Sequence, residues 1–340
     1  MSSHIVRGAF ALACAATAFA AHASCGSAFC FVNTNWSVQG VWVEPGPRFD
    51  LRYEYIDQDQ PRAGSKRVAV GQIPQDHDEV YTRNNNLFAT IDYGFAPDWG
   101  ASLVVPIVGR KHQHLEVAHD PTSGLRAKHE DHGTGDGGGD LVAENWSFTQ
   151  LGDIRVQGRW QTAFDSADTQ RARFAGATFG LKLPTGKFDV ANGNGEVAER
   201  SLQPGTGTTD ALLGVYYREM LPFQNWSWFA QFNAQVALDY RDDYKPGSQI
   251  GVDVGYRYDA TDALGLMLQL NYRWKGRDAG AQAEPDDSGG RVVTLSPGMS
   301  YTFAPNWQAY GYVQVPVYQY VNGVQLTSDW SVTVGVNAQF

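Results

Sequence analysis

Long segments of this 340-residue chain alternate between polar and apolar residues. In residues 48–55 every even position is charged and every odd position is apolar or aromatic, and residues 250–259 and 264–275 continue the two-residue period. Successive side chains of a β-strand point to opposite faces, so each segment has one polar and one apolar face. A helix would scatter the charges around its axis. The period therefore predicts an all-β protein.

The length of these segments favours strands that cross a membrane. They run to about 10–16 residues, whereas strands of globular proteins usually have about 5–6 and spanning strands need about 9–11. We expect strands near residues 48–57, 79–95, 100–117, 146–164, 172–187, 209–221, 226–241, 248–259, 262–275, 290–303, 307–320 and 327–340. Short joints alternate with longer polar ones, as in bacterial outer-membrane barrels. The predicted fold is a transmembrane antiparallel up-and-down β-barrel of about 12 strands.

The first 23 residues resemble a secretory signal peptide. Arg7 precedes an apolar run, and Ala21-His22-Ala23 supplies the small residues of a cleavage site. The run is shorter than the roughly 18 residues that a membrane-spanning helix needs. We therefore predict a signal peptide at 1–23, a short N-terminal periplasmic segment at 24–47 and an outer-membrane β-barrel at 48–340.

Two cysteines lie in the predicted N-terminal segment. Cys25 and Cys30 are five positions apart, and in an exported chain such a pair most simply forms one disulfide. A copper-binding or redox pair is the alternative. The formal net charge of −10 argues against nucleic acid as a partner.

The last predicted strand ends on an aromatic residue. Gly335, Ala338 and Phe340 resemble the terminal signal that the barrel assembly machinery of Gram-negative bacteria reads. Together with the leader and the alternating joints, this end predicts location in the cell outer membrane, with the lipid bilayer and the assembly machinery as partners.

Two motifs carry a family resemblance. Residues 180–189 (GLKLPTGKFD) and 202–210 (LQPGTGTTD) resemble the outer-membrane barrel family labelled for the MetA pathway of phenol degradation, near the fatty-acid and toluene channel group. The resemblance implies a diffusion channel or uptake porin for small hydrophobic or aromatic compounds.

The polar faces of the strands are expected to line the lumen. The predicted lining residues are Arg48, Asp50, Arg52, Glu54, Asp153, Arg155, Arg159, Asp239, Asp253, Arg257, Arg273 and Lys275. Both signs of charge are present, so the groups could flank a narrow aqueous path or fill the lumen. A constricted pore for a small solute and a non-conducting barrel that sequesters metal or makes surface contacts therefore remain as two hypotheses.

Histidines cluster around the first two predicted external loops. The candidate metal ligands are His77, His112, His114, His119, His129, His132, Asp120 and Glu130. Imidazole and carboxylate groups together suit Zn or Cu, and His112 and His114 would share one face of a strand. A solvated loop that responds to pH is the alternative. An omptin-like rim protease could also use this loop, but we predict no enzyme and no required cofactor.

Overall fold

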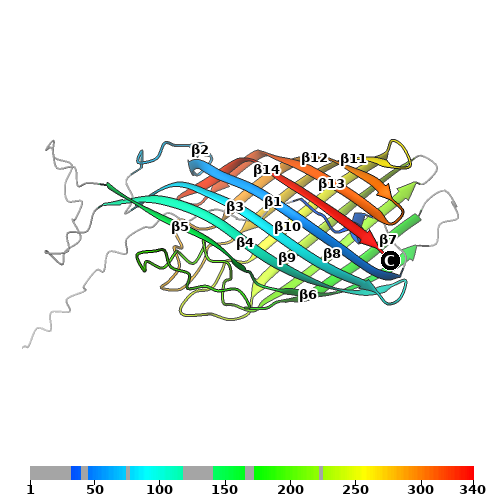
Figure 1. The fold of residues 1–340 in the computed structure, drawn as a ribbon, viewed down its shortest axis with the longest axis horizontal. Helices are drawn as coiled ribbons and strands as arrows, with labels where there is room; N and C mark the ends of the chain where they lie inside the picture. The colour runs from blue at the N-terminus through cyan, green and yellow to red at the C-terminus, as the bar shows by residue number, and fades with distance from the viewer. Residues whose placement is uncertain (1–31, 40–44, 74–76, 118–140, 165–171, 222–224) are drawn as a thin grey trace, which may run out of the picture.

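The computed structural model describes residues 32–39, 45–73, 77–117, 141–164, 172–221 and 225–340. One short helix, α1 (Trp36–Gln39), precedes the strands (Figure 1). The strands in chain order are β1 (Gly46–Ala63), β2 (Lys66–Arg67), β3 (His77–Gly94), β4 (Trp99–Val117), β5 (Leu141–Leu151), β6 (Arg155–Phe164), β7 (Ala172–Lys182), β8 (Asp210–Leu221), β9 (Trp226–Ala237), β10 (Gln249–Asp259), β11 (Leu264–Lys275), β12 (Gly290–Ala304), β13 (Trp307–Val321) and β14 (Val324–Gln339).

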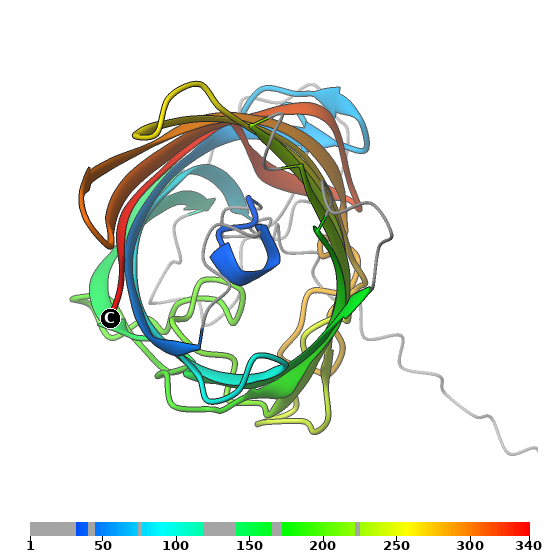
Figure 2. The same ribbon diagram turned by 90° about the vertical axis from the view of Figure 1, so that its right-hand side faces the viewer.

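The strands form one closed antiparallel barrel, which Figure 2 shows end-on. Neighbours in sequence pair with each other, and β14 closes the ring on β1 from Arg48↔Gln339 to Ala63↔Val324. β5 and β6 both pair with β4 and are two parts of one wall strand. With β2 attached only to β1, the wall has 12 strands. The predicted all-β barrel is confirmed.

The outer surface carries a broad apolar band. Exposed side chains on it include Leu103, Val156, Phe179, Val254 and Leu268. The inner face is polar, and many of its side chains are buried, among them Asn84, Gln269, Asn271, Ser296 and Thr333. This arrangement is the one that lipid requires of a barrel. Among the described residues, no helix combines the length and apolar character needed to cross a bilayer.

The two ends of the barrel differ. Brief turns, such as residues 95–98, 260–263 and 305–306, join strands at the end where the C-terminus lies, here called the short-turn end (Figure 1). At the opposite, long-loop end, residues 183–209 and 276–289 join strands through longer segments.

The N-terminal segment does not stay outside the barrel. Residues 32–39 lie in the lumen, where Figure 2 shows α1 inside the ring. The backbone N–H of Asn33 donates to Gln269 Oε1 (2.9 Å), its side-chain amide donates to Gln231, and the Trp36 ring packs edge-on against Tyr310. These residues of the predicted N-terminal segment therefore lie inside the barrel, where lumen side chains offer the backbone hydrogen-bond partners. The predicted signal peptide and Cys25–Cys30 pair lie outside the described residues.

One predicted strand, 146–164, is interrupted, and another, 172–187, ends early. Residues 152–154 break the wall strand, and β7 ends at Lys182. At this break the carboxylate of Asp153 accepts hydrogen bonds from Lys182 Nζ (2.7 Å), the backbone N–H of Gly186 (3.0 Å) and that of Thr206 (2.9 Å). Asp153 therefore holds both ends of residues 183–209 against the wall.

Residues 183–209 then cross the long-loop end of the lumen. Leu202 and Ala198 form a buried apolar cluster with Trp146 of β5 and Leu326 of β14. The guanidinium of Arg110 on β4 donates hydrogen bonds to the carbonyl oxygens of Ser201 and Leu202. These bonds fix the segment from the other side. This segment thus narrows the lumen at the long-loop end.

We expect Lys182→Met to destabilise the barrel by about 3–5 kcal/mol, because it leaves buried carboxylates without their cation. Lys182 Nζ lies 2.7 Å from Asp153 and 3.3 Å from Asp210, and all three side chains are buried. Urea unfolding in detergent micelles, followed by tryptophan fluorescence, measures the change. Lys187→Met, at an exposed lysine of the same segment, is the control. Equal unfolding midpoints for the two variants would contradict the role given to Lys182.

Candidate functional site

A cavity of about 360 Å³ occupies the lumen beside the N-terminal segment. This central cavity is bounded by residues 32–36 and by inward side chains of the surrounding strands. Its charged lining consists of four arginines and three aspartates: Arg48, Arg52, Arg155, Arg273, Asp50, Asp92 and Asp253. Its volume falls within the roughly 300–1,000 Å³ typical of small-molecule sites.

Most charges of the central cavity are paired. Arg48 Nη1 lies 2.9 Å from Asp92, and Arg273 Nη1 lies 2.7 Å from Asp253. Arg52 Nε lies 3.0 Å from Glu54. The Tyr310 hydroxyl donates to Asp50 Oδ2 at 2.8 Å. Such pairs fix the shape of the lumen, because each charge is held by a partner on the wall.

A smaller cavity of about 110 Å³ lies toward the long-loop end. Side chains of β1 and of β10 to β14 line it, including Ile56, Thr294 and Leu326. Arg273 and Gln249 line both cavities. The two spaces therefore adjoin along the barrel axis.

The structure places most of the predicted lining residues on the inner face. Arg159 and Glu54 are buried there, and Lys275 pairs with Asp278 (2.8 Å) near the long-loop end. Asp239 was expected in the lumen, but β9 ends at Ala237 and Asp239 is exposed in the following loop. There it accepts a hydrogen bond from the Thr209 N–H (2.8 Å).

Several lumen residues were missed from the sequence. Asn33 and Trp36 come from a segment without a two-residue period, and Leu212 and Phe88 are apolar side chains on inner faces. The sequence could have indicated Asp92, because this residue continues the alternation of polar and apolar residues along its strand.

The predicted metal ligands separate into two groups. His112 and His114 lie on β4 with buried side chains that contact the Trp146 ring. Oγ1 of Thr82 lies 2.8 Å from His112 Nδ1. His77 begins β3, but its side chain is not described, and His119, Asp120, His129, Glu130 and His132 lie outside the described residues.

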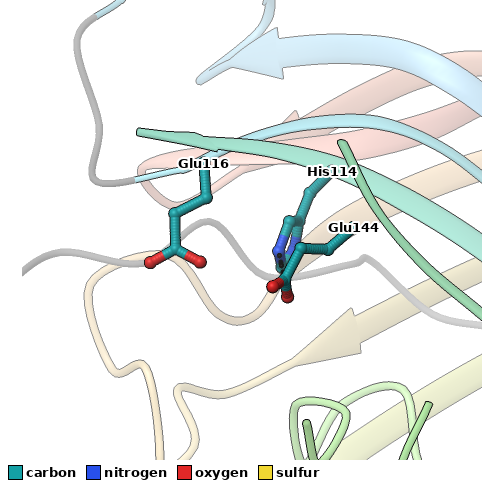
Figure 3. A group of neighbouring side chains, drawn as sticks. All are labelled: His114, Glu116 and Glu144. Atoms are coloured by element: carbon teal, nitrogen blue, oxygen red, sulfur yellow. Dashed lines mark ion pairs between the residues drawn. The ribbon is translucent and has the colours of Figure 1, made fainter. Parts of the chain in front are cut away.

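Two glutamates complete a group around His114, shown in Figure 3. His114 Nε2 lies 3.5 Å from Glu144 Oε2 on the neighbouring β5. One potential ligand atom from each of His114, Glu116 and Glu144 lies within 4.8 Å of the others. We call these three residues the mouth group, because they lie on β4 and β5 at the long-loop end. Glu116 and Glu144 were not among the predicted ligands; spacing on β4 could have suggested Glu116.

Further acidic groups surround this end of the lumen. Glu79 pairs in register with His114, and Glu284 lies in the loop after β11. Burial, followed by the negative charges of Glu199 and Glu79, raises the pKa of the Glu284 carboxyl to about 11. The protonated form of Glu284 is therefore favoured, because burial and then the neighbouring negative charges both disfavour ionisation.

The C-terminal residues complete the short-turn end. Gly335 leaves room for the Tyr310 ring, and Ala338 is fully buried. The Phe340 side chain is exposed, with its ring centroid 6.0 Å from that of Trp307. The last strand is thus built into the closing seam of the barrel.

Comparison with solved structures gives similar barrels. The COG4313 outer membrane channel from Pseudomonas putida F1 aligns over 91% of this chain and 100% of its own, with a TM-score of 0.60 and 14% identity. The Pseudomonas putida toluene transporter TodX aligns over 94% of this chain and 96% of its own, with a TM-score of 0.41 and 13% identity. A Pseudomonas aeruginosa FadL homologue covers 86% and 90%, with a TM-score of 0.36 and 10% identity.

No curated protein matches the sequence significantly. A family profile matches residues 92–326, which is more than half of the chain and includes both motifs noted in the sequence. The chain therefore belongs to the family described as "putative MetA-pathway of phenol degradation", and it is a β-barrel of the outer membrane.

Proposed function

We propose that the protein is a passive channel for a small hydrophobic or aromatic solute. The adjoining cavities inside the closed barrel carry this proposal, because they give a small molecule space along the axis. The family description, which refers to phenol degradation, supports the aromatic class. The fold shared with an outer membrane channel supports passage in place of a catalytic step.

The buried histidines do not favour the rim-protease alternative. His112 is almost fully buried, and its Nδ1 is within hydrogen-bond distance of Thr82. A catalytic base must reach a substrate proton, and this ring faces wall side chains.

Trp36→Ala is expected to raise single-channel conductance in planar bilayers by roughly twofold or more, because pore dimensions set the ion flux. The Trp36 ring, whose centroid lies 4.8 Å from that of Tyr310, fills part of the lumen. Deletion of residues 32–39 should raise conductance further. Both variants are refolded as residues 24–340, without the predicted signal peptide.

Trp36→Phe, which keeps an aromatic ring, is the control and should conduct like the wild type. Absence of openings in the wild type and in both widened variants would reject the channel and favour the non-conducting barrel.

A second proposal concerns cation capture at the mouth. The mouth group offers one imidazole and two carboxylates, a donor set that suits Zn or Cu. The surrounding acidic side chains would favour a cation electrostatically. We propose that the mouth group binds such a metal at the external entrance.

His114→Ala and Glu144→Gln should each weaken Zn binding at least about tenfold in titration calorimetry, because each removes a ligand or its partner. The triple change of His119, His129 and His132 to Ala is the comparison variant. If that variant loses binding while His114→Ala and Glu144→Gln retain it, the mouth group is not the site.

We also propose that the last strand is the signal for the barrel assembly machinery. Phe340→Ala should lower the amount of folded protein in the outer membrane several-fold, because the exposed terminal ring would no longer be available for recognition. Heat-modifiable migration of membrane fractions measures the folded amount. Trp307→Phe, which keeps the neighbouring aromatic contact, is the control. Unchanged yield of Phe340→Ala would reject this role.

A further inference from the structure

One lumen arginine lacks the partners that hold the others. Arg155 begins β6, directly after the break at residues 152–154, and its side chain lines the central cavity. Within the described part of the chain, its guanidinium forms no ion pair and no hydrogen bond. An interior guanidinium without direct hydrogen-bond partners is costly unless water or a ligand solvates it.

The carboxylates that act on Arg155 are engaged elsewhere. Asp153 and Asp210 share the Lys182 ammonium at 2.7 and 3.3 Å. Glu54 lies 3.0 Å from Arg52. Within the cavity lining, Asp92 pairs with Arg48 and Asp253 pairs with Arg273. Among the cavity-lining arginines that the structure describes, Arg155 is thus the one whose guanidinium contacts no carboxylate.

A second guanidinium lies within electrostatic range. Arg52 acts on Arg155 as a neighbouring positive charge. Its Cζ stands 4.4 Å from the centroid of the Phe88 ring, which fixes the guanidinium against an aromatic face. Two like charges facing one cavity would repel each other less if an anion lay between them.

The same cavity has an apolar wall. Strand register places Val104 of β4 directly opposite Arg155, and Phe88 and Leu212 also line the space. Gly180 of β7 is paired with both Gln157 and Leu212 and contributes no side chain between them. Cationic and apolar surfaces therefore meet in one site of about 360 Å³.

We propose that Arg155, assisted by Arg52, forms a binding subsite for the carboxylate of a small aromatic acid. Guanidinium groups bind carboxylates through two parallel hydrogen bonds, and this geometry gives specificity as well as affinity. The ring of the solute packs against Phe88, Val104 and Leu212. The inference rests on the proposed channel function and narrows its solute to amphipathic aromatic anions.

Benzoate binding to the purified barrel in detergent, measured by titration calorimetry, tests the subsite without requiring conduction. The wild type should bind benzoate more tightly than benzyl alcohol, which lacks the charge, and than acetate, which lacks the ring. Arg155→Gln should weaken benzoate binding at least about tenfold, because the charge-assisted hydrogen bonds are lost.

Arg257→Gln is the matched control, because Arg257 is a lumen arginine already bonded to Asp259 (2.7 Å) and Ser300 (3.0 Å). It should bind benzoate like the wild type. Arg155→Gln should resist urea about as well as the wild type, since the change removes no ion pair or hydrogen bond within the described residues. This readout separates loss of the subsite from loss of the fold.

The proposal is overturned if benzoate does not bind the wild type, if Arg155→Gln binds it equally well, or if acetate binds as tightly as benzoate. Planar-bilayer recordings test conduction separately from benzoate binding. Benzoate binding without any openings would retain the subsite and reject conduction, whereas openings without benzoate binding would retain the channel and reject the subsite.

Discussion

Backbone pairing around the closed ring is the constraint on which the rest of the structure depends. A strand in lipid has no water to satisfy its N–H and C=O groups, so every wall strand needs a partner on both sides. The pairing of β14 with β1 removes the last free edge of the sheet. Once the ring is closed, the register of each strand pair decides which side chains lie next to each other on the inner face. The ion pair Arg48–Asp92 joins the paired strands β1 and β3, and Arg273–Asp253 joins the paired strands β11 and β10.

An interruption of the wall at residues 152–154 anchors the segment that crosses the long-loop end. Between β5 and β6 the backbone leaves the ladder, and Asp153 turns its carboxylate toward Lys182 and two backbone N–H groups. Gly186 and Gly205 approach so closely here that a Cβ on either would collide with the other's backbone. Residues 183–209 can therefore leave the wall at a sharp corner and fold across the long-loop end. The N-terminal segment occupies the lumen nearer the other end, and the central cavity remains beside it.

Charge is distributed unevenly along the axis. The mouth group and its surroundings are rich in carboxylates, whereas the cavity lining has one more arginine than aspartate. A cation at the entrance and an aromatic anion inside are consequently separate proposals that rest on different residues. The interior preference rests on contacts. Asp153 and Asp210 contact Lys182, and Arg155 lines the cavity without touching a carboxylate of the described residues.

The sequence by itself determined the barrel, its approximate strand number and which side of each strand is polar. These follow from a two-residue period, which is a local property because adjacent side chains always point to opposite faces. It also indicated the family through residues 180–189 and 202–210. Only the tertiary structure decided that residues 32–39 enter the lumen, that Asp239 lies outside it, and that Glu144 joins His114. Each of these depends on contacts between residues far apart in the chain, such as Asn33 with Gln269, Thr209 with Asp239 or His114 with Glu144, and no local pattern encodes such contacts.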